Sequence, residues 1–218
     1  MLFRSLSRLL DEDVSGAAAF VEAWAASQPL DATGRLALGT LRLFQHRYEE
    51  AAAALEGVLT PQHDPMGLLR IARNAAAREK DLARAESDHF VVTYPKGKDE
   101  VLVPYLLDTL EAQRAALAQD LGVAPPGKVR VEILSATTDL ARLSTLTEAE
   151  IRGSGTIALC KYNKLMLVSP KALVTGYDWL DTAAHEYVHY AVALKAGPRA
   201  PIWLHEGVAK WWESRWRG

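Results

Sequence analysis

The chain is poor in cysteine, in net charge and in long apolar runs. Cys160 is the one cysteine among 218 residues, so no internal disulfide can form. It lies in an apolar stretch, which predicts a buried structural thiol rather than a nucleophile. A formal net charge of −2 shows no basic excess, so we expect no nucleic-acid partner. No stretch approaches the roughly 18 uninterrupted apolar residues that a membrane span requires.

The N-terminal segment lacks the pattern of a secretory signal. Arg4 and Arg8 are followed by the acidic residues 11–13 without a sustained apolar region between them. We therefore expect a cytoplasmic protein, or a periplasmic one if the natural start lies upstream. An apolar content of 49% is typical of a soluble globular protein, and the length suits one large domain or two small ones.

Residues 1–86 are predicted to form a helical region. Four Ala- and Leu-rich segments are separated by proline and glycine: Ala17–Ala26, Leu36–Phe44, Tyr48–Leu59 and Met66–Glu86. The part from Gly34 to Leu59 resembles one tetratricopeptide unit, although a generic amphipathic helical hairpin explains it equally well. Such a helical surface is a candidate binding site for a protein partner.

Residues 87–218 show a different periodicity, with strands and helices mixed. Strands are predicted at 89–94 and 129–134, helices at 99–121 and 139–146, and a hairpin at 156–161 and 165–169. Two further helices follow. This order predicts an α+β fold, in which a small mixed or antiparallel sheet packs on helices and is preceded by the all-α helical-hairpin region.

Residues 185–189 read His-Glu-Tyr-Val-His and form the most informative motif in the chain. Positions four apart share a helix face, so the rings of His185 and His189 can converge on one metal ion. Glu186 lies beside that face, where its carboxylate could hold a water molecule rather than the metal. Asp178 is placed to cap the N-terminus of this helix. The sequence therefore predicts two neutral imidazole ligands and a neighbouring carboxylate base.

A second motif, Trp-Leu-His-Glu-Gly-Val-Ala at residues 203–209, follows within one predicted helical hairpin that starts its second helix at Pro201. Neighbouring helical residues diverge by about 100°, so only one of His205 and Glu206 can face the metal. Two histidines and one carboxylate leave an open coordination position, which is the arrangement of a catalytic rather than a structural zinc.

The two motifs together resemble those of the gluzincin metallopeptidases. More narrowly, residues 89–218 resemble the bacterial peptidase MA-like domain, which often accompanies tetratricopeptide repeats; the segments 153–160 and 176–180 add to this resemblance. The resemblance implies one zinc ion held by His185, His189 and Glu206, with Glu186 as general base. It also implies a peptide or protein substrate that pairs with an edge strand, for which residues 153–160 are the candidate.

Two features depart from this pattern. In gluzincins the group that stabilises the oxyanion usually follows the third ligand, but no Tyr or His follows Glu206 here. Tyr162, Tyr177 and Tyr187 are upstream candidates for that group. The chain also ends on three tryptophans, for which we expect either cover from a further segment or packing on the upstream sheet.

Three questions are left open by these residues. Asp181, one turn before His185, is either a carboxylate that orients a ligand imidazole or simply an acid at a helix start. The oxyanion group is unassigned. An inactive peptidase-like domain that serves with the helical repeats as a protein-interaction module is the alternative to an enzyme.

Overall fold

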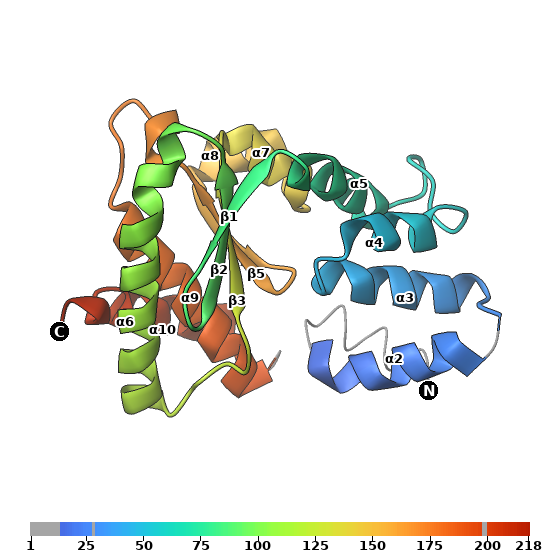
Figure 1. Cartoon of the computed structure of the whole chain (residues 1–218), viewed down its shortest axis with the longest axis horizontal. Coiled ribbons are helices and arrows are strands. Elements are labelled where there is room, and N and C mark those ends of the chain that lie inside the picture. Colours follow the sequence, from blue (N-terminus) through green and yellow to red (C-terminus); the bar gives the residue numbers. More distant parts are fainter. Residues whose placement is uncertain (1–13, 28, 198–199) are drawn as a thin grey trace. The chain divides into compact units, whose positions relative to one another are not determined.

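The computed structural model describes residues 14–27, 29–197 and 200–218 (Figure 1). The chain divides into two compact units, residues 1–80 with 142–145 and residues 81–141 with 146–218. The segment that bears on a signal peptide lies outside the described residues, and so does Pro198 in the predicted interhelical turn. No helix among the described residues is long and apolar enough to cross a membrane.

The first unit contains the predicted helices. They are α2 (Val14–Ser27), α3 (Ala32–Phe44), α4 (Tyr48–Leu55) and α5 (Leu68–Glu79). Helices α3 and α4 form the expected hairpin, and they approach closely at Gly39, where an added Cβ would lie 2.5 Å from Leu55 Cγ. Glycine is therefore required at this crossing. Helix α4 ends four residues earlier than predicted.

The prediction of helix up to Glu86 is wrong. Helix α5 ends at Glu79, and Leu82–Glu86 forms strand β1, which pairs with β2 (Phe90–Pro95) in antiparallel register. Leu-Ala-Arg-Ala-Glu has a high intrinsic preference for helix, but Ala83 and Ala85 pack against the core of the second unit. Tertiary packing and strand pairing override local propensity here.

The second unit is built on a mixed five-stranded sheet, which confirms the α+β class. The strand order is β1-β2-β3-β5-β4, with β3 at Val129–Leu134, β4 at Ala158–Lys161 and β5 at Lys164–Val168. Strands β2, β3 and β5 are parallel, whereas β1 and β4 run antiparallel to their neighbours. The predicted β4–β5 hairpin turns through Tyr162 and Asn163, both with positive φ, as a tight two-residue hairpin requires.

One face of the sheet is covered by helices α6 (Val103–Leu121) and α9 (Trp179–Ala196), as Figure 1 shows. Their core side chains include Leu106, Leu110 and Leu117 from α6 and Ala183, Tyr187 and Val188 from α9. The helix predicted to begin at Asp99 starts instead as the short helix η1 (Lys98–Leu102). Asp99 is buried there and accepts a hydrogen bond of 2.6 Å from Ser169.

The remaining elements are the helices α7 (Thr137–Leu143), α8 (Glu148–Ser154), η2 (Pro170–Ala172), α10 (Ile202–Trp212) and η4 (Arg215–Arg217). Among them, α10 packs on α9 and η4 packs on α6. Helix α8 was not predicted, although Thr147 and Glu150 form a capping box at its start. A hydroxyl residue followed three positions later by an acid was the sequence signal that could have predicted helix α8.

Candidate metal centre

Helix α9 presents two different faces to its surroundings. Its buried side carries Ala183, Tyr187, Val188 and Ala191, and the Tyr187 ring meets Phe90 edge-on at 5.2 Å between centroids. His185 and His189 lie on the other side and remain half-buried. Asp178 holds the predicted N-cap position, but its side chain makes no capping bond; its carbonyl accepts from the Thr182 amide and hydroxyl instead.

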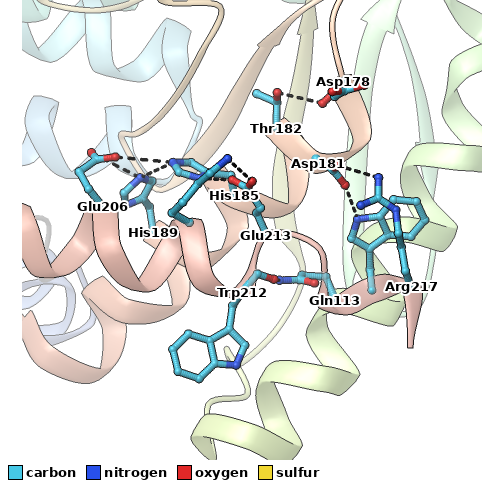
Figure 2. A network of polar contacts seen from close by, with 12 residues as sticks. Gln113, Asp178, Asp181, Thr182, His185, His189, Glu206, Trp212, Glu213 and Arg217 are labelled. Atoms are coloured by element: carbon cyan, nitrogen blue, oxygen red, sulfur yellow. Dashed lines mark hydrogen bonds and ion pairs between the residues drawn. The ribbon is translucent and has the colours of Figure 1, made fainter.

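His185, His189 and Glu206 are brought together by α9 and α10 (Figure 2). The two Nε2 atoms are 3.1 Å apart, and each lies 3.7 Å from a carboxylate oxygen of Glu206. One ligand atom from each residue falls within 4.8 Å of the other two. The Glu206 side chain is 60% exposed, compared with 21% and 18% for the two histidines.

The donor atoms suit a tetrahedral zinc ion. Ligand bonds of roughly 2.0–2.2 Å at a tetrahedral angle separate neighbouring ligand atoms by about 3.3–3.5 Å. The two Nε2 atoms are 3.1 Å apart, and each lies 3.7 Å from a different oxygen of Glu206, so the set is close to this spacing without matching it through one oxygen. Burial lowers the pKa of His189, and the nearby His185 lowers it further, so the neutral imidazole that a metal requires is favoured. These three residues form a group that could hold a metal ion.

Glu186 is not part of this group of three. It is 9% exposed, and a hydrogen bond with the backbone of Cys160 ties it to strand β4. Burial raises the pKa of its carboxyl to about 7; the charge of Glu206 adds to the rise, and the Cys160 bond opposes it. The carboxyl thus lies beside the candidate ligands without joining them, as predicted from its place on the helix.

The carboxylate that contacts a candidate ligand imidazole is Glu213 rather than Asp181. Glu213 Oε2 lies 3.0 Å from His185 Nδ1, and its other oxygen bonds Lys210 (Figure 2). Asp181 instead accepts from Trp216 Nε1 at 2.9 Å and from Arg217 at 2.7 Å. Glu213 lies seven residues, or two helical turns, after Glu206, so helix periodicity was the signal that could have found it.

Of the three tyrosines considered for oxyanion stabilisation, one has its hydroxyl bonded to a backbone carbonyl and two are buried. The Tyr177 hydroxyl donates to the Val168 carbonyl, and burial raises its pKa. Tyr187 is fully buried in the core and Tyr162 is 4% exposed. His205 lies nearer, with its ring 6.0 Å from that of His189 and tilted by 25°, but it stays outside the ligand group.

The C-terminal tryptophans differ from one another in exposure. Trp211 is 75% exposed, whereas Trp212 and Trp216 are half-buried. Trp212 Nε1 donates to Asp120 on α6 at 3.1 Å, and Arg215 donates to the same carboxylate at 2.9 Å. The two half-buried rings therefore anchor the end of the chain to α6 and α9, not to the sheet.

Comparison with known proteins does not identify a family for this chain. No protein-family model, no curated protein and no solved structure matches the chain.

Proposed function

We propose that the chain is a zinc-dependent metallopeptidase that hydrolyses peptide bonds, with His185, His189 and Glu206 as zinc ligands and Glu186 as general base. One observation carries the proposal. Two helices bring three suitable donor atoms within 4.8 Å of one another, immediately beside a buried carboxyl group. Residues distant in sequence supply this set, and its open position suits catalytic rather than structural zinc.

In this proposal the protein side chains perform the proton transfers. Zinc, when bound, polarises the scissile carbonyl and lowers the pKa of a water molecule to about 7. Glu186 accepts the proton of the attacking water and delivers it to the departing amine. Its burial suits this exchange, because a carboxyl whose pKa is about 7 can both take and release a proton near neutrality. Glu213 orients the His185 ring through Nδ1.

The edge strand β4 is the proposed binding surface for the substrate backbone. The Val168 amide donates to the Ile157 carbonyl at 2.8 Å, so Ile157 points its backbone groups toward β5. By antiparallel alternation, Ala158 and Cys160 point theirs outward from the sheet edge. The Cys160–Glu186 contact, which brings the Glu186 carboxyl to this edge, supports the proposed role of Glu186 there. An extended peptide that adds to β4 would therefore lie against Glu186.

A catalytically inactive interaction module is the second candidate, and one observation favours it. The Tyr177 hydroxyl is bonded to the Val168 carbonyl, and Tyr162 and Tyr187 are buried, so none of the three proposed tyrosines is exposed to an incoming substrate. A domain that lacked such a group would bind zinc or a peptide with little turnover.

Glu186→Gln separates the two candidates. We expect the variant to retain zinc, since Glu186 is not a ligand, and to lose hydrolysis of a mixed peptide library by a factor of at least about 100. Mass spectrometry of the library with wild-type and variant proteins provides the measurement. Hydrolysis that persists in the variant, or that chelation leaves unchanged, would refute the enzyme proposal.

A further inference from the structure

A cavity of about 350 Å³ lies at one end of the sheet in the second unit. It is bounded by the segment after β3, by helix α8, by the start of β4 and by the segment after β5. Its lining residues include Thr137, Ile151, Arg152, Thr156, Ile157 and Leu173. The parallel strands β3 and β5 both end here, and the carboxyl ends of parallel strands are a frequent place for ligand binding.

The residues that line the cavity suit a ligand group that is large and apolar rather than one that is charged. Ile151, Ile157 and Leu173 supply its aliphatic surface, and Ile151 is 4% exposed. Glu148 and Arg152 are exposed residues on α8, four positions apart and opposite in charge, so together they add no net charge to the lining. The volume is at the small end of the roughly 300–1,000 Å³ range of ligand pockets, which suits one bulky side chain.

Ile157, which lines the cavity, directly precedes strand β4, the proposed peptide-binding edge. Ala158 and Cys160 face the core beneath α9, so Ile157 projects from the opposite face of β4, where it lines the cavity. A peptide residue paired opposite Ile157 would project toward that same face. Ile157 is three residues from Cys160, which corresponds to about 10 Å along a strand.

We propose that this cavity is a specificity subsite that takes a bulky apolar side chain of the peptide substrate, about three residues from the bond that is cut. The inference rests on the proposed peptidase function. It identifies the substrate class as extended peptides with a large aliphatic or aromatic residue at that position. The subsite contains none of the candidate zinc ligands, so it can be altered without touching them.

Paired tryptophan variants at adjacent residues test the subsite. Leu173→Trp would fill the cavity, whereas Val174→Trp adds the same ring at a fully exposed neighbour outside the lining. Substrates are matched peptides that carry Phe or Ala three residues from the cleaved bond. We expect the wild type to prefer Phe by about tenfold or more in kcat/KM. Leu173→Trp should abolish the preference by lowering kcat/KM for the Phe peptide, and Val174→Trp should keep the preference.

A second variant and a binding measurement test the same subsite independently of Leu173→Trp and of hydrolysis. Ile157→Ala enlarges the cavity and should shift the preference from Phe toward Trp. Binding of the same peptides to Glu186→Gln protein, followed by fluorescence anisotropy, needs no hydrolysis and should show the same tenfold difference. Equal preference for Phe and Ala in both readouts, or a preference that Leu173→Trp retains, would overturn the subsite. Wild-type protein that cuts no peptide would overturn the peptidase proposal alone.

Discussion

Helices α9 and α10 contribute to the same candidate centre but are held in very different ways. Helix α9 buries one whole side, including Tyr187 with no exposed surface and Ala183 and Ala191 beside it. Helix α10 buries only Ala209, while Ile202, Trp203 and Trp211 are each more than 70% exposed. The histidines are therefore fixed by the core, whereas Glu206 is carried by a helix with a single fully buried side chain.

Under the proposed function, this difference means that the two histidines are held in place by the core before zinc binds, whereas the position of Glu206 would be stabilised by zinc. Few buried apolar contacts give a helix low local stability. A metal ion that binds only the folded arrangement would add stability where packing does not. The predictions below follow from this contrast.

The largest effect is expected from Tyr187→Ala on α9. Removal of a fully buried ring that packs on Phe90 should lower the free energy of unfolding by about 3–5 kcal/mol. Urea denaturation measures this loss. Trp211→Ala on α10 is the control, because a 75% exposed ring should change stability by less than about 0.5 kcal/mol. Comparable losses in both variants would contradict the contrast between the helices.

Zinc should stabilise the chain mainly through α10. At a free concentration of about 100 times Kd, zinc is expected to raise the free energy of unfolding by about 2.7 kcal/mol. Hydrogen exchange should slow at α10 amides far more than at those of α9, since the latter are already protected by the core. Glu206→Ala should remove both effects. Equal protection of the two helices would show that α10 is as rigid as α9 without metal.

Glu213→Gln should weaken zinc binding about 10- to 100-fold, because the contact from Glu213 Oε2 to His185 Nδ1 fixes the ring of a proposed zinc ligand. Competition with a chromophoric chelator measures the affinity. Lys210→Ala removes the partner of the other carboxylate oxygen and should have little effect, since Lys210 is exposed. An unchanged affinity in Glu213→Gln would exclude this positioning role.

The smallest effect is expected at Glu111, away from the candidate centre, and concerns the stability of the fold at acid pH. Burial works against ionisation of Glu111, but hydrogen bonds from Ser87 and His89 outweigh it and hold the pKa of its carboxyl below the ordinary 4.5. A depressed pKa stabilises the fold above pH 4.5, and this contribution is lost as the pH falls through the folded value. Glu111→Gln should cost roughly 1 kcal/mol at pH 7 and little below that pKa. A cost that does not depend on pH would refute this origin.

The sequence predicted the elements whose signal is local. Strand β3 alternates strictly, the β4–β5 hairpin carries its own turn, and α9 and α10 are bounded by Asp178 and Pro201. Strand β1 could not be found in this way, because Leu82–Glu86 has helical propensity and becomes a strand only by pairing with β2. The order of strands in the sheet likewise depends on contacts between distant segments.

The residues of the candidate centre likewise fall into those that local sequence signals predict and those that depend on tertiary contacts. Helix periodicity placed His185 and His189 on one face and Glu186 beside it. The contact between Glu213 and His185 joins residues 28 positions apart, and the engagement of Tyr177 with Val168 depends on how a loop folds back on β5. Helix periodicity could have placed Glu213 on the same face as Glu206, but the engagement of Tyr177 could not be derived without the tertiary structure.

Zinc stoichiometry tests the central claim most directly. Elemental analysis of tag-free protein, after reconstitution and removal of free metal, should find about one zinc per chain. His189→Ala and Glu206→Ala should each lose it, and His63→Ala, a substitution in the first unit, should retain it. Wild-type protein without zinc, or His189→Ala that keeps it, would contradict the proposed centre.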